Sequence, residues 1–111
     1  MKTIIAGGRD YRMTFGDLLH LDAYRRSLPI TEVVSGAASG ADACGANWAL
    51  SRGIRVLEFP ADWSTHGKAA GPIRNQQMAD YADALIAFPG GRGTADMIRR
   101  AEKRGLKVIR L

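Results

Sequence analysis

The segment Ala84–Phe88 (ALIAF) runs directly into Pro89–Thr94 (PGGRGT). A short, continuous apolar run that ends at proline and glycine is typical of a buried β-strand. The residues that follow, Thr94–Arg104, have helical periodicity up to Gly105, and glycine commonly ends a helix. A buried strand, a glycine-rich turn and an amphipathic helix in this order predict part of a βαβ unit.

The same alternation of strands and helices extends over the whole chain. We expect further strands at Lys2–Ala6, Thr31–Ser35, Ile54–Phe59 and Lys107–Leu111, and further helices at Thr14–Ser27, Ala41–Ser51 and Pro72–Tyr81. The stretch Ala61–Ala70 is expected to be irregular. This pattern predicts a three-layer α/β Rossmann-like domain with a five-stranded parallel sheet and helices on both faces. In such folds the ligand lies beyond the carboxyl ends of the strands.

The composition is that of a globular domain. The chain has 111 residues, of which 46% are hydrophobic and 24% are charged, so we expect one domain over residues 1–111. The longest apolar run, Ala84–Pro89, is too short to cross a membrane, which takes about 20 residues, and no secretory signal is predicted. Cys44 is the single cysteine. We therefore expect a cytoplasmic protein without membrane contact, and no residue calls for a metal or another cofactor.

The net charge of +5 comes from the end of the chain. From Arg99 onward, six basic residues stand against one acidic residue, Glu102. Four of the basic residues fall at helical spacing and form a basic stripe: Arg99, Arg100, Lys103 and Arg104. The stripe is either a solvated helix face or a weak contact surface for nucleic acid. Because Met97, Ile98 and Ala101 must face the sheet, we expect the stripe to point away from the glycine-rich turn.

The turn after Phe88 is expected to bind an anion. Glycines let the backbone approach a ligand closely, and the first N–H groups of the following helix are unpaired and partially positive. Together they form a phosphate cradle, in which the Thr94 hydroxyl either caps the helix or contacts the phosphate. The candidate residues are Pro89, Gly90, Gly91, Arg92, Gly93 and Thr94.

The first turn, after the strand Lys2–Ala6, has the same backbone chemistry with a charged side chain added. Gly7 and Gly8 allow close approach of the backbone, and Arg9 can grip a phosphate through two hydrogen bonds. Asp10 either accepts a hydrogen bond from a ribose hydroxyl or orients Arg9. The alternative is an Arg–Asp pair on the surface that binds no ligand.

The second turn, Ser35–Asp42, consists of small residues and lacks the Lys-Ser/Thr pair of a Walker A motif. Ser35 and Ser39 are predicted to donate hydrogen bonds to a ligand. Asp42 lies in the first helical turn, where a carboxylate caps the helix, orders the loop or binds a sugar hydroxyl. The candidate residues are Ser35, Gly36, Ser39, Gly40 and Asp42.

The irregular stretch leaves the third strand and therefore reaches the same edge of the sheet. Lys68 and Arg74 are predicted to neutralise phosphate, and Asn75 is predicted to hydrogen-bond a base or a sugar. Asp62 and His66 have the chemistry for acid–base catalysis, although a single histidine in a loop is more often a surface residue.

Four segments in this order resemble the SLOG superfamily of nucleotide-binding Rossmann-like domains, in particular its small single-domain YspA-like (cpYpsA-related) branch. They are IAGGRDY (Ile5–Tyr11), SGAASGAD (Ser35–Asp42), GKAAGPIRNQQM (Gly67–Met78) and ADALIAFPGGRGT (Ala82–Thr94). The resemblance covers nearly the whole chain and implies a nucleotide-related ligand. It leaves the activity open, because the superfamily contains enzymes, ligand sensors and DNA-binding proteins.

One related family implies a hydrolase. Lonely Guy phosphoribohydrolases cleave the N-glycosidic bond of nucleoside monophosphates and have a PGGxGTxxE pattern and an MxxRK-type segment. Pro89–Thr94 matches the first pattern, and the second places Arg74 on their catalytic arginine. Met97 occupies the position at which those enzymes have the glutamate. The nearest carboxylate, Asp96, is one residue earlier and therefore about 100° away around a helix. The resemblance thus implies Arg74 and Asp96 as catalytic candidates.

Another related family, DNA-processing protein A, binds single-stranded DNA and has a segment similar to Ser35–Asp42. Only 7% of the residues are aromatic, whereas single-strand binders use dense stacking platforms. Our main hypothesis is therefore binding of a nucleotide or nucleotide-derived ligand, either ADP-ribose- or NAD-like or a nucleoside monophosphate, by a sensor or sequestering protein. N-glycosidic hydrolysis and single-stranded nucleic-acid binding are the alternatives. We also expect a homodimer, because exposed helix faces on small Rossmann-like domains often pair.

Overall fold

The computed structural model describes all residues, 1–111, and contains one five-stranded sheet. Its strands are β1 (Lys2–Ala6), β2 (Glu32–Ser35), β3 (Arg55–Glu58), β4 (Ala84–Ala87) and β5 (Lys107–Arg110). Neighbouring strands are parallel throughout, in the order β3-β2-β1-β4-β5. The predicted α/β fold with a five-stranded parallel sheet is confirmed. β1 is central, because the chain first builds outward to β3 and then returns to place β4 on the other side of β1.

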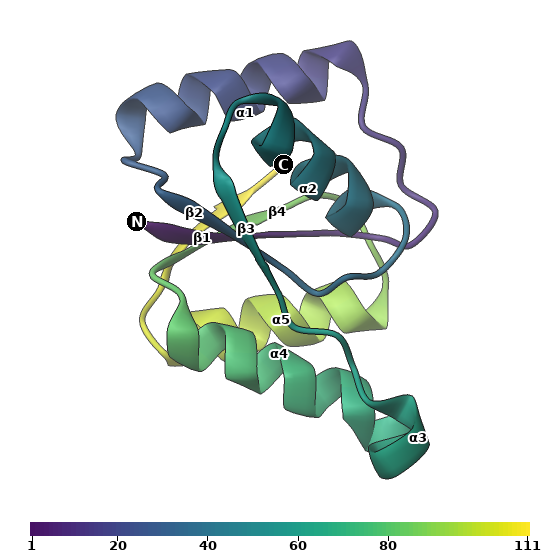
Figure 1. Cartoon of the computed structure of the whole chain (residues 1–111). Helices are drawn as coiled ribbons and strands as arrows, with labels where there is room; N and C mark the ends of the chain where they lie inside the picture. The colour runs from purple at the N-terminus through teal and green to yellow at the C-terminus, as the bar shows by residue number, and fades with distance from the viewer.

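Helices cover both faces of the sheet (Figure 1). α1 and α2 lie on one face, and α4 and α5 lie on the other. Their bounds are Phe15–Ser27 for α1, Ala41–Ser51 for α2, Ala70–Tyr81 for α4 and Arg92–Lys103 for α5. Alternate residues of β1 serve the two layers, since Ile5 packs with Leu21 of α1 and Ile4 packs with Met97 of α5. No helix has the length and apolar character needed to cross a lipid bilayer.

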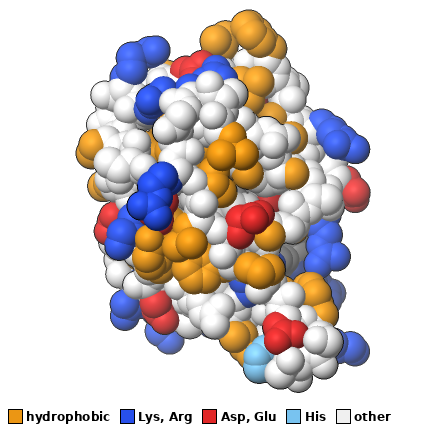
Figure 2. Space-filling view, viewed as in Figure 1, with side chains coloured by type: hydrophobic (Ala, Val, Ile, Leu, Met, Phe, Trp, Pro, Cys, Tyr) orange, Lys and Arg blue, Asp and Glu red, His pale blue; other side chains and the backbone are white.

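The prediction that Ala61–Ala70 is irregular is wrong. The structure has a short helix, α3 (Trp63–His66), and a 3₁₀ turn at Gly67–Ala69 that leads directly into α4. Asp62 starts α3, because its carboxylate accepts a hydrogen bond from the Thr65 N–H at 3.1 Å. This contact gives Asp62 a capping role. α3 projects from the body of the molecule next to the start of α4 (Figures 1 and 2).

Two helices begin earlier than predicted. α4 begins at Ala70, so Pro72 lies in its first turn, where a missing N–H costs no helical hydrogen bond. α5 begins at Arg92, with Gly91 as its N-cap residue and no side-chain cap. Thr94 is therefore buried within the first turn and does not cap the helix. As a result, the first N–H groups of α5 come from the glycine-rich sequence itself.

Candidate functional site

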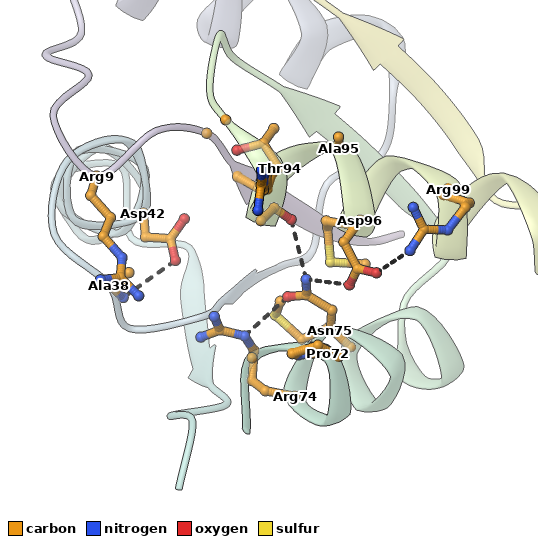
Figure 3. A pocket seen from close by; sticks show the side chains of 18 of the residues that line it. Arg9, Ala38, Asp42, Pro72, Arg74, Asn75, Thr94, Ala95, Asp96 and Arg99 are labelled. Atoms are coloured by element: carbon orange, nitrogen blue, oxygen red, sulfur yellow. Dashed lines mark hydrogen bonds and ion pairs between the residues drawn. The ribbon is translucent and has the colours of Figure 1, made fainter. Parts of the chain in front are cut away.

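A cavity of about 800 Å³, which we call the main cavity, lies beyond the carboxyl ends of β1 and β4. The strand order changes direction at this point, since β2 and β3 lie on one side of β1 and β4 and β5 lie on the other. Rossmann-like folds bind ligands at such points. The wall combines the loop after β1 with the starts of α2, α4 and α5 (Figure 3). The predicted site residues that line it are Gly7, Arg9, Asp42, Arg74, Asn75, Gly91, Arg92, Gly93, Thr94 and Asp96.

Several predicted glycines hold the loops together and do not line the main cavity. The Gly8 N–H donates to the Pro89 carbonyl at 2.9 Å, and the Gly8 carbonyl accepts from the Ala41 N–H at 3.1 Å. Gly40 has a φ of +74°, and a Cβ there would overlap the Gly8 carbonyl oxygen. A Cβ on Gly90 would overlap the Thr94 hydroxyl and lie 2.7 Å from the Gly8 nitrogen. The roles of Gly8, Gly40, Pro89 and Gly90 in the structure are thus loop–loop packing.

The start of α5 presents free hydrogen-bond donors to the main cavity. Ala95 is the first residue of this segment whose N–H is bonded, to the Gly91 carbonyl at 3.0 Å. The N–H groups of residues 91–94 have no acceptor within the protein. A Cβ on Gly91 or on Gly93 would meet nothing within 4 Å. The space in front of these donors is therefore open, and the positive end of the helix dipole points into it.

The buried carboxylate of Asp42 and the half-buried guanidinium of Arg74 meet around Gly36. A Cβ on Gly36 would lie 2.7 Å from an Asp42 oxygen and 2.7 Å from an Arg74 nitrogen, so any side chain there would have to displace both groups. Asp42 accepts from the Ala38 N–H at 3.3 Å, and Arg74 donates to the Gly36 carbonyl. Burial raises the pKa of Asp42 to about 6, although the backbone N–H groups and the Arg74 charge act against it. Burial also lowers the pKa of Arg74.

Asn75 and Asp96 form a polar bridge between α4 and α5 (Figure 3). The Asn75 side chain accepts from Arg74 Nε at 3.0 Å and donates to Asp96 Oδ2 at 2.9 Å. Arg100 Nε donates to the same Asp96 oxygen at 2.9 Å, and Arg99 donates to the other oxygen. Burial acts to raise the pKa of Asp96, but the hydrogen bonds from Arg100 and Asn75 together with the two arginine charges lower it overall. Asp96 is therefore an ionised carboxylate that accepts hydrogen bonds.

Four other predicted residues also lie outside the main cavity, in addition to Gly8, Gly36, Gly40, Pro89 and Gly90. Ser35 is buried, and its hydroxyl accepts from the Ala37 N–H at 3.2 Å. Ser39 donates to the Arg9 carbonyl at 3.3 Å and lines a smaller second cavity of about 370 Å³. Asp10 and Lys68 are exposed and line neither cavity. In the structure the two serines order the second loop and the backbone of the first.

The expectation that the basic stripe points away from the glycine-rich turn is wrong for Arg99, which lines the main cavity. Arg100 also faces α4, since it donates to Gln76 at 2.9 Å, and Arg104 pairs with Asp80 at 3.2 Å. Lys103 is the member of the stripe without an ion pair. Figure 2 shows lysine and arginine side chains scattered over one face of the molecule. The stripe is thus largely tied into contacts between α4 and α5.

The sequence analysis missed Trp63. This residue lies at the start of α3, lines both cavities, and carries the Arg9 guanidinium 5.7 Å from its ring centroid. A local sequence pattern could have indicated its position. Asp62 follows the third strand and stands three residues before Thr65, a spacing typical of a helix N-cap. A helix there would have placed Trp63 at the edge of the sheet where the glycine loops meet.

Comparisons with known proteins identify a family and a relative of this chain. The model of the YspA, cpYpsA-related SLOG family matches residues 1–66, which run from β1 to the end of α3. The chain is 38% identical to the Gene 61 protein of Mycobacterium phage D29, across 97% of this chain and 94% of that protein. No solved structure gives a significant match. The family match thus includes the loops after β1 and β2, whereas the likeness to the phage protein extends across α4 and α5 as well.

Proposed function

Because the chain belongs to the YspA, cpYpsA-related SLOG family, whose functions are nucleotide-related, we propose that it binds a nucleotide-derived ligand in the main cavity. The ligand is an ADP-ribose- or NAD-like molecule or a nucleoside monophosphate. The protein acts on it as a sensor or a sequestering protein. A volume of about 800 Å³ suits such a molecule, since small-molecule sites commonly measure about 300–1,000 Å³.

The observation that carries this proposal is the set of unpaired N–H groups at residues 91–94. They face the same cavity as the guanidinium groups of Arg9 and Arg74. Backbone donors at a helix start together with arginines favour a phosphate, because both supply positive charge and directed hydrogen bonds. We therefore assign the phosphate to the space between the start of α5 and these two arginines.

The rest of the main cavity supplies acceptors for hydroxyl groups. Asp96 is ionised, and its carboxylate lies beside the Asn75 amide on the wall formed by α4 and α5. Asp42 adds a second carboxyl group on the side of α2. Sugar hydroxyls donate to such groups, so we assign the ribose of the ligand to the region between them.

One observation favours hydrolysis as a second candidate function. Asp42 lines the main cavity close to Arg74, and its pKa of about 6 suits a general acid that works near neutral pH. In N-glycosidic hydrolysis the bond between C1′ and the base breaks, the oxygen of water bonds to C1′, and the base leaves with a proton. Asp42 would donate that proton and recover it from the water, while Arg74 and Asp96 would hold the phosphate and the sugar.

Replacing Arg74 by alanine is expected to weaken binding of AMP and ADP-ribose about tenfold or more, because a hydrogen bond to a charged group contributes roughly 1.5–3 kcal/mol. Arg74→Lys should retain part of the affinity, since it keeps the charge and loses the planar fork. Isothermal titration calorimetry measures both. Arg104→Ala is the matched control, because it removes the same charge from an exposed pair with Asp80 outside the main cavity. Equal affinities in Arg74→Ala and wild type would contradict the assignment.

Incubation with AMP separates the two candidate functions. A binding protein leaves AMP intact, whereas a hydrolase releases adenine and ribose 5-phosphate, which chromatography resolves. If adenine appears, Asp42→Asn should abolish its release and should leave AMP bound. Release of adenine by Asp42→Asn at the wild-type rate would remove Asp42 from the mechanism.

A further inference from the structure

Trp63 is a large aromatic side chain that neither hydrophobic core uses. Its residue is 49% exposed and belongs to neither of the two core clusters. The tip of its indole ring rests against α4, 3.4 Å from where a Cβ on Gly71 would lie. A tryptophan that is half exposed gains much less hydrophobic free energy on folding than a fully buried one. The packing of the fold thus does not account for a tryptophan at this position.

Trp63 is also the one aromatic residue that lines the main cavity or the second cavity. The two cavities share Arg9, Ala38, Trp63 and Arg74 in their walls, so the indole stands where they meet. The Arg9 guanidinium lies 5.7 Å from the ring centroid, which is within the range of a cation–π contact. Arg9 thus contacts the indole, and its positive charge acts to lower the pKa of both Asp42 and Arg74.

We propose that Trp63 is the stacking platform for the base of the ligand, and so the residue that selects ligands with an aromatic base over base-free sugar phosphates. This inference rests on the proposed function. The unpaired N–H groups of residues 91–94 and the indole of Trp63 line the same cavity. A nucleotide whose phosphate contacts the start of α5 therefore has one flat aromatic surface available to its base in the cavity wall. Every nucleobase has a π-face, so stacking on the indole tolerates different bases.

The capping of α3 explains how a short projecting helix holds this platform in place. Asp62 accepts from the Thr65 N–H at 3.1 Å and from the Ser64 hydroxyl at 2.9 Å. These contacts fix the first turn, in which Trp63 is the first residue. The indole is therefore presented to the cavity before the ligand arrives, which reduces the entropy lost on binding.

The test compares AMP with ribose 5-phosphate, which lacks the base, and includes ADP-ribose as a larger ligand with the same base as AMP. Dissociation constants of AMP, ADP-ribose and ribose 5-phosphate are measured by calorimetry for wild type, Trp63→Leu and Trp63→Phe. Base–aromatic stacking is worth about 1–3 kcal/mol per base, so Trp63→Leu should weaken AMP and ADP-ribose binding roughly fivefold to a hundredfold. Binding of ribose 5-phosphate should stay within about twofold, because that ligand has no base to stack. Trp63→Phe should restore most of the affinity for AMP, because it keeps an aromatic face.

Fluorescence gives a second readout, since the chain has two tryptophans and Trp48 is only 2% exposed. AMP should protect Trp63 from quenching by acrylamide, and ribose 5-phosphate should not. The inference is overturned if Trp63→Leu binds AMP and ADP-ribose as wild type does, or if it loses all three ligands to the same extent. A wild-type protein that binds none of the three would instead overturn the proposed function, and this inference with it.

Discussion

Gly91→Val is expected to abolish nucleotide binding while the protein remains folded. In the wild type a Cβ at this position would meet nothing within 4 Å, so valine fits without a clash. Its φ of −100° lies outside the left-handed region that favours glycine. The branched side chain would occupy the space in front of the N–H groups of residues 91–94, which the phosphate needs. Valine is a poorer N-cap residue than glycine, so we expect a loss of stability of about 1 kcal/mol.

The neighbouring glycine provides a matched comparison. A Cβ on Gly90 would overlap the Thr94 hydroxyl and lie 2.7 Å from the Gly8 nitrogen, so Gly90→Ala should lower the thermal unfolding temperature much more than Gly91→Val does. Calorimetric titration with AMP and thermal unfolding of both variants check these expectations. If Gly91→Val binds AMP with wild-type affinity, the phosphate does not lie at the start of α5. If both variants unfold at the wild-type temperature, the described packing of Gly90 is incorrect.

The parallel sheet could be predicted because each strand is a short apolar run between glycine and proline signals. Ala84–Phe88 shows this most clearly, and β4 (Ala84–Ala87) lies inside it. Helix starts were less predictable. The glycines before Thr94 suggested a loop up to that residue, yet α5 begins at Arg92, because the packing of the loops around Gly90 and Gly8 fixes the backbone there. Such contacts between distant segments leave no local signal.

The segments that form the site could be predicted from the sequence, but the role of each residue within them could not. Four glycine-containing segments were expected to meet a ligand, and each of the four contributes residues to the wall of the main cavity. Gly90 and Gly91 are adjacent and of the same type, yet the first packs against Gly8 and the second faces open space. That difference depends on which loops touch, and the sequence carries no local record of that contact.

Asp42→Asn is expected to stabilise the protein at neutral pH by up to about 3 kcal/mol, because one pKa unit corresponds to about 1.4 kcal/mol. Burial raises the pKa of Asp42 from 3.8 to about 6. Between these two pH values the unfolded chain releases the proton while the folded protein retains it. The free energy of unfolding therefore falls as the pH rises from about 4 to about 6, and the loss is complete above that range. Asparagine has no charge to bury, and its side-chain oxygen can still accept from the Ala38 N–H.

Urea unfolding of wild type and Asp42→Asn at several pH values between 4 and 8 measures this effect. The two proteins should be nearly equal in stability at pH 4, and the variant should gain progressively up to about pH 6.5. Asp10→Asn is the control, because Asp10 is exposed and makes no hydrogen bond. A variant that is less stable than wild type at pH 7 would show that the interaction with Arg74 fully offsets the free-energy cost of burying the ionised carboxylate. The expected gain instead means that the fold carries a destabilising charge at the edge of the main cavity, as binding and catalytic sites commonly do.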